Sequence, residues 1–510
     1  MRSRLLLAMV FCAASPVLLR AENPPAAVLA PGELSDPAPT GASERLSLSV
    51  QEAVLMALEN NRALRMERIT PLVREADEQV ERAAFDFVLG GEISDGRERA
   101  DAIAFTNEEA RATTGAASLS KKFSVGADVA LDVETTRDSS LPEARDHTSR
   151  AGLSITQALL RGAGRGPNLA NLRQARLDYE LSEYELRGFA EALVAEVEVT
   201  YWAHVLAQRQ IEIYERSLQL AEQQLAETLQ RVRVGSLAET ELAAAQAENA
   251  LRREALIGAR GRAAALRARL VRLVYPAGLG GGVQEILSES APRLPDELPG
   301  TLEEHLAMAV RLRPELNEAR LRLKRQDLDL VKTRNGLLPR LDLFVRLGKS
   351  GYAASFDASV SDLDGDSYDA SAGLELEWPL GRREARARHR QAQLTRAQAG
   401  EAMANLGDLI REDVEIACIE VAQSREQIAA TSATRTFQEE NLRAEMAKFR
   451  SGKSTSLSVA QVQRDLVSSE IAEVEAIVRH LQALVVLYRN DGSLLLRRRI
   501  AAPGAEPANE

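Results

Sequence analysis

The chain has 510 residues, 75 acidic against 64 basic side chains, a formal net charge of −11, and 4% aromatic residues. This acidity argues against a nucleic-acid partner. Few aromatic residues together with abundant alanine and charged residues favour long, closely packed helices over a thick globular core.

Residues 1–21 have the layout of a secretory signal, with Arg2 and Arg4, an apolar run from Leu5 to Leu19, and the small residue Ala21. We therefore expect export, followed by a flexible segment over residues 22–44. Cys12 raises a lipoprotein alternative, against which its neighbour Phe11 argues, because lipid attachment normally follows a small residue. Lipidation of the N-terminus stays open.

The other cysteine is Cys418, so we expect no intrachain disulfide and no cysteine-based metal site in the exported chain. No stretch after the leader approaches the roughly 18 continuous apolar residues of a membrane-spanning helix. If the protein crosses a membrane, we expect it to do so with strands.

Two halves of the chain resemble each other, which indicates a duplicated fold. Glu52–Leu64 matches Glu304–Leu316 at an offset of 304 − 52 = 252, Gln157–Gly162 matches Glu377–Arg382 at 220, and Gly235 matches Gly452 at 217. We expect a first repeat over residues 45–275, a linker over 276–300, a second repeat over 301–490 and a C-terminal tail over 491–510.

Alternating apolar residues predict one pair of strands that is common to both halves, within about 84–160 and 340–379. The alternating apolar residues of the first half are Phe85, Phe87, Leu89, Leu153 and Ile155. Those of the second half are Leu341, Leu343, Val345, Leu347, Leu374, Leu376 and Trp378. The opposite face of the second pair carries Arg340, Asp342, Arg346, Glu375 and Glu377. One apolar and one charged face fit a barrel wall between lipid and water, although a soluble sheet covered on one face gives the same pattern.

The first half has about 252 − 220 = 32 additional residues before Gln157. They include Ser118–Glu134, where alternation around a Ser124–Gly126 turn predicts a hairpin without a counterpart in the second half. The sequence leaves open whether this hairpin joins the barrel or lies outside it.

Very long helices follow the strands in both halves, because proline is absent from 168–275 and from 381–502. Asn168 to Gly235 spans 235 − 168 = 67 residues, or roughly 100 Å of helix. A coiled-coil stripe runs through Ile211, Tyr214, Leu218, Ala221, Leu225 and Val232. Gly235 and Gly452 interrupt these helices and permit chain reversal, so we expect helical hairpins over about 168–275 and 383–490.

Three strings carry a family resemblance: Arg231-Val-Arg-Val-Gly235-Ser-Leu-Ala-Glu-Thr-Glu-Leu242, Leu153-Ser-Ile-Thr-Gln-Ala-Leu-Leu-Arg-Gly162 and Leu338-Pro-Arg-Leu-Asp-Leu343. With the repeated order of short helix, strand pair, long helix, glycine turn and returning helix, the chain resembles the TolC-like outer-membrane efflux protein family over nearly all of residues 45–490. The resemblance implies a mainly α-helical homotrimer, in which four strands per chain form a twelve-stranded β-barrel continuous with a periplasmic α-helical barrel.

The resemblance also implies a site at the glycine turns, where a periplasmic adaptor would dock. The candidate contacts are Val234, Gly235, Ser236, Leu237, Gly452 and Lys453, and the alternative is that both glycines only cap helices. Some relatives carry pore-constricting aspartates six and nine positions after the second glycine, where this chain has Ser458 and Gln461. Glu241 is a candidate for a substitute ring of carboxylates, against the simpler interpretation of an exposed helical glutamate.

The sequence points to no enzyme, cofactor or metal site. The five histidines lack metal-ligand spacing, and Arg450–Ser454 resembles only the tail of a phosphate loop, since Ala447 stands where glycine is needed.

The favoured function is a passive outer-membrane exit duct of a tripartite efflux or type I secretion system. Its partners would be an adaptor, an inner-membrane pump and outer-membrane lipid, with the cargo and the pump class (RND, ABC or MFS) left open. A periplasmic coiled-coil adaptor is the alternative, and the duplication counts against it. A purely structural coiled coil would leave the strand pairs unexplained.

Overall fold

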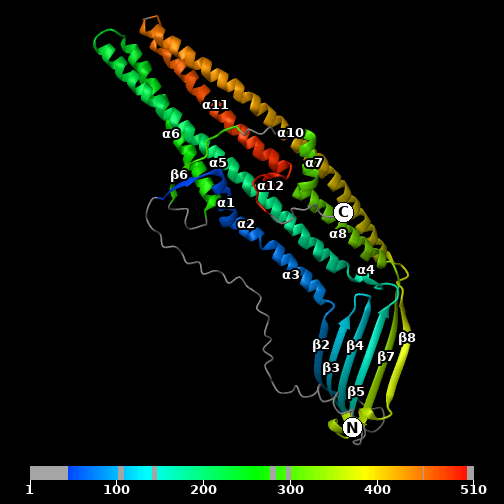
Figure 1. Ribbon diagram of the computed structural model, residues 1–510. Helices are drawn as coiled ribbons and strands as arrows, with labels where there is room; N and C mark the ends of the chain where they lie inside the picture. The colour runs from blue at the N-terminus through cyan, green and yellow to red at the C-terminus, as the bar shows by residue number, and fades with distance from the viewer. Residues whose placement is uncertain are drawn as a thin grey trace.

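The computed structural model describes residues 44–100, 108–139, 146–275, 283–294, 300–451 and 453–501. The molecule is elongated, with a β-sheet at one end and the tips of two helical hairpins at the other (Figure 1). The expected signal (1–21), the flexible segment up to residue 43, and Gly452 lie outside the described residues.

Both halves begin with the same helical opening. In the first half it comprises α1 (Val50–Asn60), α2 (Arg62–Glu67) and α3 (Thr70–Ala83), and in the second α7 (Leu302–Leu312) and α8 (Pro314–Asn335). Ser49 with Glu52 caps α1, and Thr301 with Glu304 caps α7, each as a complete capping box. The two glutamates that align in the sequence therefore perform the same structural task.

A small parallel pair joins β1 (Glu44–Leu48) to β6 (Val283–Ser288). β6 lies inside the segment expected to be a plain linker over 276–300. Tyr201 connects this pair to the long helix behind it, because its hydroxyl donates to the carbonyl of Leu48 at 2.8 Å and accepts from the amide of Ser290 at 3.1 Å.

The main sheet has six strands in the order β2-β3-β4-β5-β7-β8, all antiparallel to their neighbours. They are β2 (Phe87–Ala100), β3 (Glu108–Lys122), β4 (Ala127–Asp138), β5 (His147–Ala158), β7 (Arg340–Ala353) and β8 (Tyr368–Glu377). The hairpin expected within Ser118–Glu134 is β3–β4, with Gly126 at φ +86° in its turn. It lies inside the sheet, so the sheet of the described residues has six strands, where the resemblance implies four strands per chain in the barrel.

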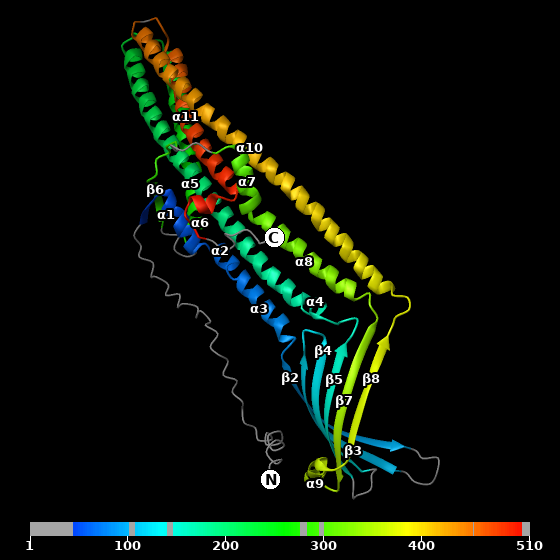
Figure 2. The same cartoon turned by 45° about the vertical axis from the view of Figure 1, so that its right-hand side comes forward.

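The far end of the sheet is covered by α9 (Phe356–Ser361) and the 3₁₀ turn η2 (Asp362–Asp364). The hydroxyl of Ser359 lies 2.8 Å from that of Ser149 on β5. Both views place α9 away from the helices (Figure 2).

Four long helices form two hairpins: α5 (Ala170–Arg233) with α6 (Glu239–Val274), and α10 (Arg383–Arg450) with α11 (Ser456–Asn490). The short α4 (Arg165–Asn168) precedes α5. At 64 and 68 residues, α5 and α10 are each about 100 Å long. The prediction of a mainly helical chain with a sheet is confirmed.

Next to the sheet, the helices form a single layer. α3 packs on α5, α5 on α8, and α8 on α10, and this order runs above the sheet from β2 to β8 (Figures 1 and 2). α3 leads into β2, α8 leads into β7 and α10 follows β8, while α5 follows β5 after the short α4. We refer to α3, α5, α8 and α10 as the four-helix wall.

The main core lies midway along the molecule, where α1, α5, α6 and α11 meet. The C-terminal segment belongs to it: α12 (Leu494–Arg497) inserts Leu494 and Leu495, which are 0% and 1% exposed. Arg498 adds an ion pair to Glu198 of α5, at 2.5 Å. Residues 491–501, expected to belong to a tail, are thus a packed part of the fold, because their apolar side chains complete the core.

Candidate functional site: helical tips and two-faced sheet

The first helical tip is a turn built on Gly235. The amide of Gly235 donates to the carbonyl of Val232 at 3.0 Å, and the amide of Ser236 to that of Arg231 at 2.9 Å. These two bonds with φ +77° at Gly235 form a Schellman motif, which satisfies helix-end carbonyls while the chain reverses. The glycine therefore has a capping role, whatever else the tip does.

The second tip repeats this pattern. The amide of Lys453 donates to the carbonyl of Lys448 at 2.9 Å, as Ser236 does to Arg231. Thr455 then caps α11 by accepting from the amide of Ser458 at 3.2 Å. Hydrogen bonds from Ser454 and Lys448 hold the pKa of the Glu445 carboxyl below its ordinary value.

The expected docking residues are solvent-facing where they are described. Val234 is 77% exposed, Ser236 and Lys453 are exposed, and Leu237 is half-buried. A single exposed valine is normal on a protein surface, so its exposure makes the tip accessible without marking it as a contact. Docking itself stays a prediction.

The three expected constriction residues have different surroundings. Gln461 is exposed, and Ser458 lies in the first turn of α11 with its hydroxyl 3.0 Å from that of Thr455. Glu241 accepts a hydrogen bond from the Ser456 hydroxyl of the other hairpin. In the single chain, the Glu241 carboxylate thus joins α6 to α11, and its role in a ring stays a prediction.

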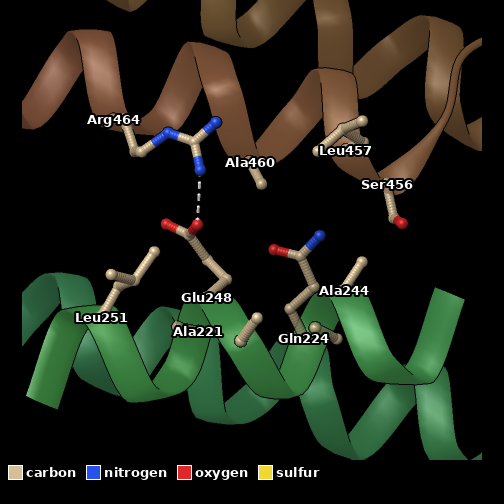
Figure 3. Close-up of a pocket in the computed structure, with 11 residues that line it drawn as sticks. Ala221, Gln224, Ala244, Glu248, Leu251, Ser456, Leu457, Ala460 and Arg464 are labelled. Atoms are coloured by element: carbon tan, nitrogen blue, oxygen red, sulfur yellow. Dashed lines mark hydrogen bonds and ion pairs between the residues drawn. The ribbon is translucent and has the colours of Figure 1, made fainter.

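A second junction between the hairpins lies two turns further along α6 and was not expected from the sequence. Glu248 accepts from Arg252 of its own helix at 2.7 Å and from Arg464 of α11 at 2.7 Å. Figure 3 shows Arg464 and Glu248 pointing toward each other, and both line a cavity of about 160 Å³. The i,i+4 spacing of Glu248 and Arg252 is visible in the sequence, but Arg464 is 216 residues away from Glu248. We call the Glu248–Arg464 ion pair the tip link.

At the other end of the molecule, the sheet has one apolar and one polar face. The register of the strands forms one row of leucines across the apolar face, with one residue from each of five neighbouring strands: Leu89, Leu119, Leu131, Leu153 and Leu347. One position further along each strand, the opposite face has the row Gly90, Ser118, Asp132, Gly152, Gly348 and Asp369. This is the alternation of a wall between hydrocarbon and water.

Aromatic residues flank the apolar face along β8. Tyr368 lies on the same side as Leu374 and Leu376, because side chains alternate along a strand, and Trp378 directly follows the last residue of β8. They are 378 − 368 = 10 residues apart, about 33 Å along the strand or about 25 Å along the normal at a tilt of about 40°. That height and the aromatic borders are typical of the lipid-facing band of outer-membrane strands.

Within the described ranges, no group of three or more His, Cys, Asp or Glu side chains is arranged to hold a metal ion. In the same part of the chain, no helix combines the length and apolarity needed to cross a membrane. Cys418 is a half-buried free thiol on α10, and burial raises its pKa.

Solved structures similar to this chain share its fold. A membrane protein from Pseudomonas aeruginosa aligns with a TM-score of 0.68 at 22% identity, covering 87% of this chain and 93% of that one. The Campylobacter jejuni CmeC outer membrane channel aligns with 0.68 at 15% identity, covering 90% and 87%. The open state of the Neisseria gonorrhoeae MtrE outer membrane channel aligns with 0.62 at 18% identity, covering 87% and 89%.

A comparison with curated proteins found no match. The family model of the outer membrane efflux proteins matches residues 54–274 and 306–493, which confirms the resemblance drawn from the sequence and does not favour the adaptor alternative. Because this match spans both repeats and most of the chain, the protein belongs to the outer membrane efflux protein family, whose members are outer-membrane channels rather than enzymes.

Proposed function

We propose that three copies of the chain assemble into a passive exit duct, which extends from the outer membrane into the periplasm and docks a periplasmic adaptor at its helical tips. An inner-membrane pump supplies the energy, and cargo diffuses through the water-filled lumen. The number of copies follows the family resemblance. The six-stranded sheet supports the assembly of several copies.

The observation that carries this proposal is the six-stranded sheet with one lipid-type face. β2 and β8 are the edges of the described sheet, and their apolar side chains, such as Leu89 and Leu376, are 79% and 61% exposed in the single chain. In hydrocarbon, unpaired edge amides and carbonyls cost several kcal/mol each. Pairing edges between copies removes that cost, so membrane insertion and assembly depend on each other.

The tips supply both docking and control of opening in this proposal. Each copy holds its two hairpins together through the tip link and through the Glu241–Ser456 hydrogen bond. A third contact, between Arg216 of α5 and Glu470 of α11 at 3.7 Å, lies further from the tips. Since all three join α5 or α6 to α11, an adaptor that separates the hairpins would widen the tip.

A test of assembly uses outer membranes from cells that express the full chain. The proposal predicts trimers that resist detergent and dissociate on heating, together with ion conductance in planar bilayers. A soluble periplasmic monomer without conductance would refute the duct.

A test of docking places a photo-crosslinking residue at Val234, which is exposed, and as a matched control at Val197, which is 0% exposed in the core. The proposal predicts capture of a periplasmic adaptor from position 234 only. Capture from neither position, in cells whose efflux depends on the protein, would refute docking at this tip.

A further inference from the structure

The β3–β4 hairpin is built into the sheet on both sides. β3 pairs with β2 from Phe87↔Lys121 to Ala100↔Glu108, and β4 pairs with β5 from Ala127↔Gln157 to Arg137↔His147. These are full-length antiparallel ladders, comparable with those of the outer strands. The hairpin therefore separates β2 from β5 by two strands.

The turn of the hairpin is also tied to the junction between sheet and helices. The amide of Gly164 donates to the carbonyl of Val125 at 3.0 Å, and the amide of Ala158 to that of Gly126 at 2.9 Å. A Cβ at Gly126 would lie 2.2 Å from the carbonyl oxygen of Gly162. This close approach fixes the hairpin turn against the segment that leads into α5.

The two faces of the hairpin match those of the other four strands. On the apolar face, Leu119 and Leu131 continue the row from Leu89 to Leu153. On the polar face, Asp132 lies beside Gly152, where a Cβ would come within 2.4 Å of its carboxylate. A hairpin folded away from the wall would expose its leucines to water or its carboxylates to lipid, so this sidedness assigns it to the wall.

The hairpin also brings the sheet to the width of the helices above it. With strands about 4.8 Å apart and tilted by about 40°, six strands cover about 38 Å of circumference and four cover about 25 Å. The four-helix wall, with helices about 9 Å apart, covers about 36 Å. Six strands therefore continue the helical layer without a taper, whereas four would narrow it by a third.

Building on the proposed trimeric duct, we propose that its membrane wall has 3 × 6 = 18 strands, in which β8 of one copy pairs with β2 of the next. Six alternating strands leave β2 and β8 antiparallel, so this closure continues the antiparallel order around the ring. The diameter grows roughly linearly with strand number. The exit is thus about 1.5 times as wide as a twelve-stranded one and about 2.3 times its area, and it admits solutes that a twelve-stranded exit excludes.

The first test is an electron cryo-microscopy map of the full chain in lipid nanodiscs. Eighteen strands in a trimer, with β8 next to β2 of the neighbouring copy, is the expected result. A trimer with twelve wall strands and the hairpin outside would overturn this inference and leave the proposed duct intact. Absence of a trimeric barrel would overturn both.

The second test measures the width of the exit with neutral polyethylene glycols of graded size, added to the strand side of a planar bilayer. A variant without residues 108–138 keeps β2 and β5, which are antiparallel and able to pair directly. The largest polymer that enters and lowers the conductance should be larger for the natural chain than for this variant. Equal size limits for two heat-modifiable trimers would overturn the inference about width, and if the variant does not assemble, the map of the natural chain decides.

Discussion

The tip link offers a direct test of how the two hairpins are held together. Replacing Arg464 by alanine removes an ion pair whose side chains are 42% exposed for Arg464 and 10% exposed for Glu248. A pair of this exposure contributes about 1 kcal/mol. Glu248 keeps its ion pair with Arg252 at 2.7 Å, so the substitution leaves no buried charge without a partner. The loss of stabilising free energy therefore stays near the contribution of the Glu248–Arg464 pair itself.

In the proposed trimer the link occurs three times around the closed tip. Loss of all three removes about 3 kcal/mol of preference for the closed arrangement, and since about 1.4 kcal/mol is a factor of ten, the ratio of open to closed tips should rise about 100-fold. The measurement is the open probability of single channels in planar bilayers.

The matched control is Arg479→Ala on the same helix. Arg479 pairs with Glu475 one turn before it and with Gln427 of its own hairpin, so its loss leaves the junction between hairpins intact. An unchanged open probability in Arg464→Ala, or an equal rise in Arg479→Ala, would show that the tip link does not hold the tip closed.

Three further predictions concern stability, each measured as thermal unfolding of the purified protein. Gly235→Ala should destabilise the protein by about 1–2 kcal/mol, because alanine is strained at the left-handed φ of +77°. Gly261→Ala, in the middle of a helix with open space around the added Cβ, should instead stabilise the protein by about 0.5–1 kcal/mol. Equal effects of the two substitutions would contradict this prediction. Leu495→Ala should cost about 2–5 kcal/mol and Leu496→Ala far less, because the side chains are 1% and 49% exposed; similar losses would refute the packed C-terminal segment. Burial raises the pKa of Glu191 to about 7, above its unfolded value of 4.5. The contribution of the protonated Glu191 to the free energy of unfolding is therefore fully present below pH 4.5 and is lost as pH rises through about 7. The stability of Glu191→Gln relative to the natural chain should rise across this window, and a pH-independent difference would refute the prediction.

Elements set by local pattern could be predicted from the sequence. The long helices, the two reversal points and the β3–β4 hairpin follow from proline spacing, glycine position and alternation, all of which act over a few residues. The capping boxes at Ser49 and Thr301 include Glu52 and Glu304, the glutamates that align at the starts of the two matching segments. The family resemblance rested on these same segments.

Two features were decided by contacts between distant parts of the chain. The place of the hairpin depends on which strands lie beside it, and the ladders from β2 to β5 put it inside the sheet. Residues 491–501 were expected to belong to a C-terminal tail, but Leu494 and Leu495 fill a core to which α1, α5 and α6 contribute from more than 200 residues away in sequence.

The tips show the same division between local and long-range information. Gly235 and the turn around it were set by the sequence alone, because a Schellman motif needs only a few neighbouring residues. The tip link needed the tertiary structure, because Glu248 and Arg464 meet only when both hairpins have folded and packed side by side. Periodicity thus determined the helices and strands of this chain, while the partners of its charges and the order of strands in its sheet depended on how those elements pack.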